Sequence, residues 1–104
     1  MTLTREQIED MSQQQLRQEI ARLINHSDYD PDYSNDIVIA WKLVEEMNRH
    51  CWTVNVQFEA GGITVFVTER GAVSNQSKKI WEFGDTAPIA ICRAWLIWSE
   101  EVGG

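Results

Sequence analysis

The stretch at residues 85–98, DTAPIAICRAWLIW, decides the fold of this chain because it combines a helix start signal with the most apolar run in the sequence. Asp85 or Thr86 can accept hydrogen bonds from the first free backbone N–H groups of a helix. Pro88 falls in the first turn, where a missing N–H costs nothing. Apolar side chains then follow on more than one side: Ile89, Ile91, Cys92, Trp95, Leu96, Ile97 and Trp98. We therefore expect a closing helix with protein on most of its sides.

The length and charge of the chain set the class of protein. Its 104 residues are enough for one core, so residues 1–104 are interpreted as a single domain. The net charge of −7 argues against nucleic acid as a partner, because such binding depends on Lys and Arg neutralising phosphates. There is no charged-then-apolar leader and no apolar run of membrane-spanning length. Cys51 and Cys92 do not form a secreted disulfide pattern, which predicts free thiols in a cytoplasmic protein with no membrane contact.

The first part of the chain predicts a short capped segment and a helix. Thr4 with Gln7 has the form of a capping box and opens a segment over residues 5–11. Ser12 with Gln15 repeats the signal. The helix that follows has a narrow apolar stripe made of Leu16, Ile20, Leu23 and Ile24, and it is expected to lie on the surface and end near residue 25.

A second helix is predicted after a loop at residues 26–33, whose Asp, Ser and Pro content breaks any periodicity. Ser34 or Asn35 is the expected cap of this helix. Its core face consists of Ile37, Ala40, Trp41, Val44 and Met47, widened by Val38, Ile39 and Leu43. The width of this face predicts that the first half of the helix is largely covered.

At Trp52 the hydrophobic period changes from that of a helix to that of a strand. Apolar residues then alternate with polar ones, which predicts a strand with one covered face made of Trp52, Val54, Val56 and Phe58. Ala60, Gly61 and Gly62 supply the permissive backbone for a hairpin. Residues 63–68 are therefore expected to return as an antiparallel neighbour.

The remaining segments complete the element order. Residues 69–77 are polar and are interpreted as a loop. Residues 78–83 predict a third short strand, in which Trp81 and Phe83 share one face. The order α-α-β-β-β-α predicts an α+β fold, a small layered α/β sandwich with a three-stranded antiparallel sheet packed against helices.

Several positions together resemble a known family. They are Tyr33, Ser34, Asp36, Ile37, Trp41, Val44, Trp52 and the motif DTAPIAICRA at residues 85–94. Over about residues 16–98 the chain resembles the phage ABA sandwich domain family, which consists of small proteins of phages and prophages. Cys51 departs from the pattern, since the family usually has Gly before the Trp. The resemblance implies a small α/β sandwich without an established biochemical activity.

Two patterns that could indicate catalysis or metal binding lack essential parts. Oxygen-bearing side chains recur at Asp28, Asp30, Asp32, Ser34 and Asp36. A calcium loop counted from Asp28 would need Gly and a bidentate carboxylate where the chain has Tyr33 and Ile39. His50 and Cys51 are neighbours, but no third group is identifiable that would orient the imidazole. We therefore expect no metal, no cofactor and no enzyme activity.

A basic loop is the candidate site for an anionic small molecule. Its residues are Arg70, Lys78, Lys79 and Trp81. Cations beside an aromatic ring can hold a phosphate and a base together, although the same residues would also keep an edge strand soluble. Arg93 is a lone cation in the apolar closing helix. It either joins such a pocket or reaches Asp85, Asp36 or Glu100.

The aromatic content points to an interface. Five Trp residues together with Phe66 and Phe83 are more than a sheet of this size readily buries, so an exposed aromatic surface is expected, with Trp95 and Trp98 as its main contributors. The leading hypothesis is a non-enzymatic phage accessory protein that binds a protein partner, such as a host protein, or self-associates, with a homodimer favoured. The alternative is a protein that sequesters a nucleotide-like signalling molecule through the basic loop.

Overall fold

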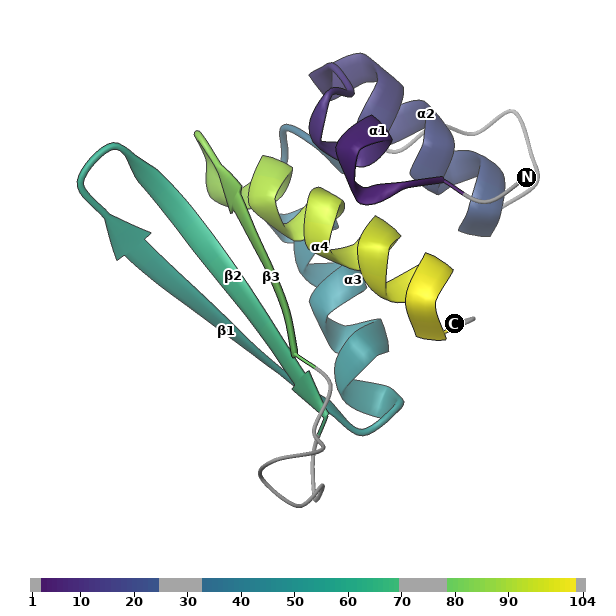
Figure 1. Ribbon diagram of the computed structural model, residues 1–104, viewed down its shortest axis with the longest axis vertical. Helices are drawn as coiled ribbons and strands as arrows, with labels where there is room; N and C mark the ends of the chain where they lie inside the picture. The colour runs from purple at the N-terminus through teal and green to yellow at the C-terminus, as the bar shows by residue number, and fades with distance from the viewer. Residues whose placement is uncertain (1–2, 25–32, 70–78, 103–104) are drawn as a thin grey trace.

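The computed structural model describes residues 3–24, 33–69 and 79–102. Its elements are α1 (Arg5–Glu9), α2 (Gln13–Ile24), α3 (Ile37–Arg49), β1 (Trp52–Glu59), β2 (Gly62–Glu69), β3 (Lys79–Gly84) and α4 (Ala87–Val102). Their order and the three-stranded antiparallel sheet confirm the predicted α+β sandwich (Figure 1). The short α1 lies in the segment for which a separate capped start was predicted.

The sheet has the strand order β1-β2-β3, and both neighbouring pairs are antiparallel. Glu59 pairs with Gly62, which leaves Ala60 and Gly61 as the turn. Gly61 has a φ of 97°, the positive value that such a tight hairpin turn requires. The predicted hairpin is confirmed, and β3 ends at Gly84, one residue beyond the predicted end.

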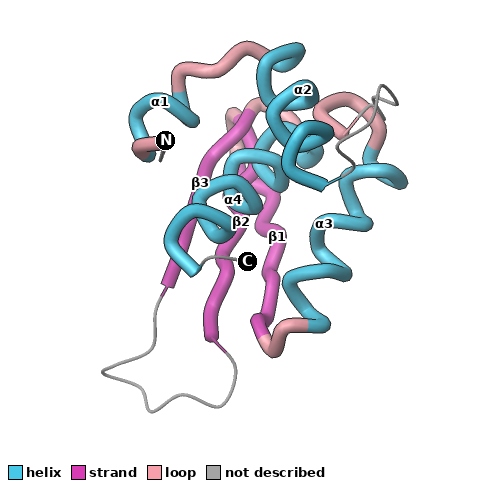
Figure 2. Tube along the Cα trace, turned by 90° about the vertical axis from the view of Figure 1, so that its right-hand side faces the viewer, coloured by secondary structure: helices cyan, strands magenta, loops and turns pink. Residues whose placement is uncertain are grey.

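The described helices all lie on one face of the sheet, and the opposite face is open (Figures 1 and 2). Helix α4 occupies the centre of the molecule, in contact with β2, β3 and all three other helices. Residues along its middle are completely buried: Ala90, Ile91, Cys92, Ala94 and Leu96. This confirms a closing helix that has protein on most of its sides, and the helix continues to Val102.

The start of α4 packs directly on the end of β3. A Cβ atom on Gly84 would lie 2.7 Å from the backbone nitrogen of Ala90, which only a residue without a side chain allows. The Thr86 hydroxyl accepts a hydrogen bond from the Ile89 N–H at 3.5 Å, so Thr86 caps the helix as predicted. Gly84 therefore fixes how closely the central helix approaches the sheet.

The two capping boxes predicted near the N-terminus are both present. The Gln7 N–H donates to the Thr4 hydroxyl at 3.2 Å, and the Thr4 N–H donates to the Gln7 side chain at 2.8 Å. Ser12 and Gln15 form the same reciprocal pair at 3.2 and 2.8 Å. These boxes start α1 and α2 as separate helices, and both helices pack against α4.

Helix α3 begins later than its predicted cap. Asp36 is the N-cap, and its carboxylate accepts a hydrogen bond from the Val38 N–H at 2.9 Å. The prediction of Ser34 or Asn35 as the cap is therefore wrong. Ser34 is instead buried in the turn that leads into the helix.

The first half of α3 is not covered as predicted. Ile37, Val38 and Trp41 are 44%, 72% and 46% exposed. The reason is that α4 and β1 cover only one flank of the helix, which consists of Ala40, Leu43, Val44 and Met47. Helix α3 therefore presents an exposed apolar stripe, made of Ile37, Val38 and Trp41.

Strand β1 also differs from its prediction at one end. Trp52 is buried on the helix side of the sheet as expected, but Phe58 is 76% exposed. The hairpin end of β1 and β2 projects beyond the helices, so no described helix covers it (Figure 1). The alternation of the strand is correct, and the error lies in how far the helix layer extends.

Candidate functional site

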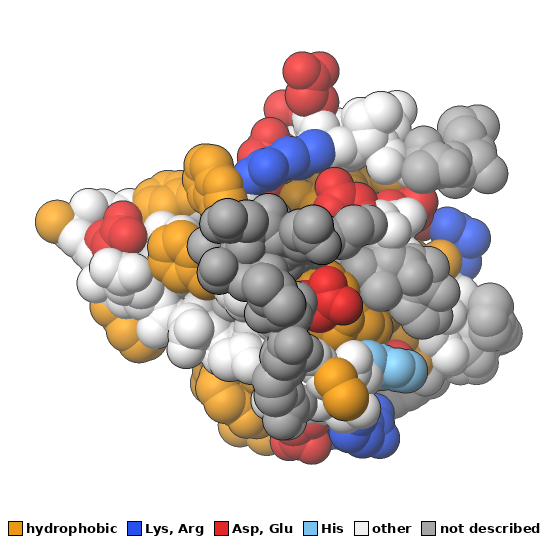
Figure 3. Space-filling view, turned by 60° about the horizontal axis from the view of Figure 1, so that its bottom comes forward, with side chains coloured by type: hydrophobic (Ala, Val, Ile, Leu, Met, Phe, Trp, Pro, Cys, Tyr) orange, Lys and Arg blue, Asp and Glu red, His pale blue; other side chains and the backbone are white. Residues whose placement is uncertain are grey.

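The open face of the sheet carries three exposed aromatic side chains, Phe66, Trp81 and Phe83, which together are called the aromatic face. They are 37%, 52% and 39% exposed. The strand register places Phe66 directly opposite Trp81, with Asn55 on its other side. At the left of Figure 3, the surface over the strands shows hydrophobic and uncharged polar side chains with few charged ones. The aromatic face therefore exposes three aromatic rings in a chain whose net charge is −7.

Trp95 and Trp98 do not contribute to a surface, and the expectation that they would is wrong. They are only 3% and 1% exposed within a single chain. The indole N–H of Trp95 donates to the Glu46 carboxylate at 3.1 Å, and the His50 ring lies 5.6 Å from the Trp98 ring. Helix α3 covers both indoles because it packs along α4. The exposed aromatic residues come from the sheet and α3 instead.

Arg5 of α1 binds the edge of β3 through several contacts. Its guanidinium donates to the Trp81 carbonyl oxygen at 2.6 Å and to the Glu82 carboxylate at 3.3 Å. The same group lies 4.8 Å from the centre of the Trp81 ring and 3.6 Å from the Glu9 carboxylate. This cluster of Arg5, Glu9, Trp81 and Glu82 is called the α1 clamp. It joins the first helix to the last strand.

Glu82 is an unusual carboxyl because its residue is only 2% exposed on the covered side of the sheet. Its pKa is raised to about 7, first by burial and then by a hydrogen bond to Glu9, against the Phe83 N–H and Arg5, which lower it. The carboxyl therefore changes protonation state close to neutral pH. A protonated Glu82 can share its proton with Glu9 while Arg5 remains in contact with both.

The structure brings together only part of the predicted anion site. Arg70 and Lys78 lie outside the described residues, and Lys79 begins β3. Trp81 is exposed on the open face of the sheet. Arg93 does not reach the predicted carboxylates, since its guanidinium donates to the Phe83 carbonyl oxygen at 2.7 Å. The sequestration of an anionic ligand by the basic loop stays a prediction.

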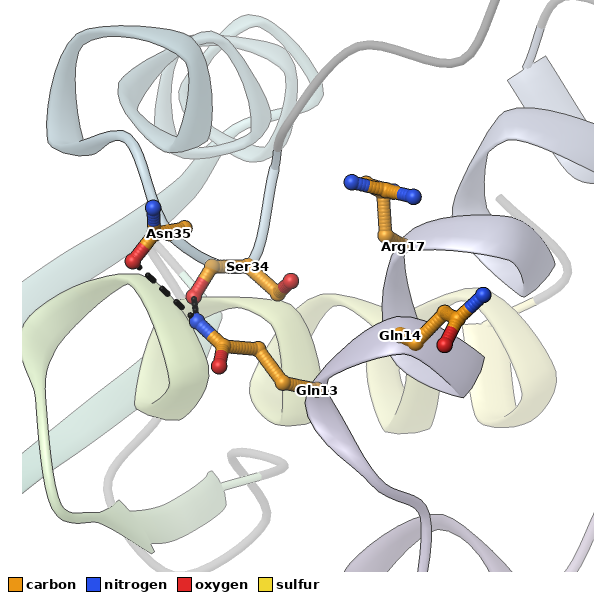
Figure 4. A pocket seen from close by; sticks show the side chains of 5 residues that line it. All are labelled: Gln13, Gln14, Arg17, Ser34 and Asn35. Carbon is orange, nitrogen blue, oxygen red and sulfur yellow. Dashed lines mark hydrogen bonds between the residues drawn. The ribbon is translucent and has the colours of Figure 1, made fainter.

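The hollows on the described surface include a polar one and an apolar one. The larger, of about 400 Å³, is polar and is lined by Gln13, Gln14, Arg17, Ser34 and Asn35 (Figure 4). Gln13 reaches across it from α2 and donates to the Ser34 carbonyl oxygen at 2.9 Å. The smaller hollow, of about 280 Å³, is apolar and is lined by Ile37, Val38, Trp41 and Glu45. Only the apolar hollow adds to the exposed hydrophobic surface.

The remaining predicted features give no catalytic constellation among the described residues. Asp28, Asp30 and Asp32 of the acidic loop lie outside them, and within the described ranges no group of three His, Cys, Asp or Glu residues could hold a metal ion. Cys51 is exposed and Cys92 is buried. No described helix is long and apolar enough to cross a membrane.

The α1 clamp was missed by the sequence reasoning, although one signal for it was present. The alternation of β3 places Glu82 on the same side as Ile80, which is the covered side. A carboxyl at a covered position requires a cation or a proton. The identity of the cation could not be found this way, because Arg5 is 77 positions away in the chain.

The fold and these surfaces define a small α+β sandwich protein with one open sheet face. The sequence model of the phage ABA sandwich domain family matches residues 7–96 of this chain. The chain therefore belongs to that family. The family assignment made from the sequence is confirmed. No curated protein and no solved structure matches the chain.

Proposed function

We propose that this chain is a non-enzymatic accessory protein of a phage or prophage that binds another protein through the aromatic face. The family supports the phage context. The observation that carries the binding role is the exposure of Phe66, Trp81 and Phe83 together on an uncovered sheet. The centres of protein interfaces are rich in aromatic residues, and this face exposes three of them.

The charge of the chain favours one kind of partner. The exposed Glu59 lies at the hairpin end of the same sheet, where it pairs with Gly62, and the net charge is −7. A partner with an apolar contact centre surrounded by Lys and Arg complements this arrangement and is steered toward it. The described polar clusters support a role without catalysis, because Arg5 and Glu46 hold elements of the fold together.

The test compares two exposed tryptophans of similar accessibility. The wild-type chain is used to isolate proteins from phage-infected host cells, and each candidate is then purified and titrated by calorimetry. Trp81→Ala is expected to raise the Kd about tenfold or more, because central aromatic residues dominate interface energies. Trp41→Ala on α3 is the matched control and should leave the Kd unchanged. A purified partner that binds wild type and Trp81→Ala equally would contradict the proposal.

A further inference from the structure

The free edge of β3 is closed by side chains. The Trp81 carbonyl oxygen accepts a hydrogen bond from Arg5 at 2.6 Å. The Phe83 carbonyl oxygen accepts one from Arg93 at 2.7 Å, and the Phe83 N–H donates to the Glu82 carboxylate at 3.3 Å. Arg5 belongs to α1 and Arg93 to α4, so two helices occupy this edge. Another strand could pair here only by breaking these bonds.

The free edge of β1 has no such closure. The N–H and C=O of one residue in an antiparallel strand point to the same side, and the side alternates along the strand. The backbone carbonyl groups of Trp81 and Phe83 point away from β2. The register therefore directs the backbone N–H and C=O groups of Phe66 toward β1, and those of Asn55 toward Phe66. The backbone groups left on the free edge of β1 include those of Val54, Val56 and Phe58. No side chain in the described part of the chain is bonded to them.

The composition of β1 also lacks the usual protection of an edge strand. Residues 52–58, WTVNVQF, contain no charged residue and no Pro. Natural edge strands are normally kept apart by Lys, Pro, bulges or a covering element. Phe58, at the end of the strand, is 76% exposed. An exposed edge of this composition is suited to pairing with another strand.

The apolar stripe of α3 lies on the same side of the molecule. Glu46 accepts a hydrogen bond from Trp95 of α4, which turns that flank of α3 toward α4. Helical periodicity then places Ile37 and Trp41 on the opposite flank, away from α4. Figure 2 shows α3 beside β1, at the other end of the sheet from α1. The unprotected edge and the exposed stripe therefore adjoin one another.

We propose that two copies of this chain pair through the free edges of their β1 strands, antiparallel and around a two-fold axis, into a closed dimer. The two three-stranded sheets then form one continuous sheet, and both α3 helices lie on the same face of it. Phe58 of one copy comes to lie beside the first half of β1 of the other. This inference goes beyond the binding of a foreign protein by the aromatic face, and it leaves that face open on both copies.

Three observations favour a second copy over a foreign strand. Two chains of net charge −7 repel each other in general, so a contact between copies needs an uncharged segment. Residues 52–58 are such a segment, because no like charges meet there. A two-fold axis brings the α3 stripe of each copy toward its equivalent, which a lone foreign strand would leave exposed. The outer edges of the paired sheet are both β3 edges, which Arg5 and Arg93 close, so growth stops at two copies.

The experiment measures the mass of the full chain by size-exclusion chromatography with light scattering over a range of concentrations. Wild type is expected to be a dimer. Phe58→Lys places a charge on the free edge at an exposed position and should weaken dimerisation about tenfold or more without unfolding the chain. Val56→Pro removes an outward N–H that does not bond to β2, and should act in the same direction. Phe66→Lys, a charge on the aromatic face at a residue outside the α1 clamp, is the matched control and should remain dimeric.

Each other result overturns the inference. A wild-type chain that is monomeric at about 100 µM excludes the dimer. A dimer lost in Phe66→Lys and kept in Phe58→Lys would show pairing through the aromatic face. Assembly beyond two copies would contradict the closure by β3. None of these masses depends on the calorimetric comparison of Trp81→Ala with Trp41→Ala, so the partner-binding role is tested separately.

Discussion

At the scale of single residues, Cys51 holds a backbone conformation that costs free energy. Its φ is 69°, in the left-handed region that side chains with a Cβ disfavour. The residue ends the turn between α3 and β1, where its N–H donates to the Asn48 carbonyl oxygen at 3.1 Å. A Gly at this position would adopt the positive φ without a Cβ penalty.

Cys51→Gly is expected to raise the free energy of unfolding by about 0.5–1 kcal/mol, because relief of the left-handed strain exceeds the added chain entropy. Thermal denaturation under reducing conditions measures the change. Cys51→Ala is the control, since it removes the same thiol and keeps the Cβ. Equal stabilities of the Gly and Ala variants would show that the strain is negligible.

At the scale of elements, the α1 clamp explains how a helix of five residues stays attached to the fold. So short a helix is not stable by its own backbone hydrogen bonds. Ile8 is buried against the core, and Arg5 adds bonds to the backbone and carboxylate of β3. The attachment also depends on pH, because Glu82 is buried within it.

The pKa of Glu82, raised from its ordinary 4.5 to about 7, predicts the sign of this dependence. Between these values the folded chain keeps a proton that the unfolded chain has lost. The contribution of Glu82 to stability is therefore fully present below about pH 4.5 and declines as the pH rises through 7. Glu82→Gln, which stays neutral, should gain in Tm relative to wild type between pH 5 and 8.

The exposed Glu59→Gln is the control for this comparison, and its Tm difference from wild type should not change over the same range. Thermal unfolding followed by circular dichroism gives the profiles of all three chains. Parallel profiles for wild type and Glu82→Gln would mean that the carboxyl keeps an ordinary pKa in the folded state.

At the scale of the whole molecule, α4 is the common contact of the sheet and the other helices. Leu96, near its centre, is completely buried. Leu96→Ala is expected to lower the free energy of unfolding by about 2–5 kcal/mol, because the surrounding elements cannot close the cavity without separating from each other. Denaturant titration measures the loss. Leu23→Ala, at a partly buried position on α2, should cost clearly less, and equal losses would contradict the central role of α4.

The sequence was sufficient for features that depend on neighbouring residues. The capping boxes at Thr4 and Ser12, the hairpin at Gly61 and the start of α4 at Thr86 all depend on residues a few positions apart, so local pattern predicts them. The family followed from the same local motifs. The candidate site was predicted less well: Trp81 lies on an exposed face, whereas Trp95 and Trp98 are buried.

Local pattern by itself determined the element order, the alternation of the strands and the all-round apolar character of α4. Only the tertiary structure decided which apolar residues stay exposed, since that depends on how far the helix layer extends over the sheet. Trp41 and Phe58 were predicted to lie on covered apolar faces, and they are exposed because no described element reaches them. Likewise, Arg5 and Arg93 could be assigned to the edge of β3 only from the fold, because burial and pairing are set by contacts between segments far apart in the chain.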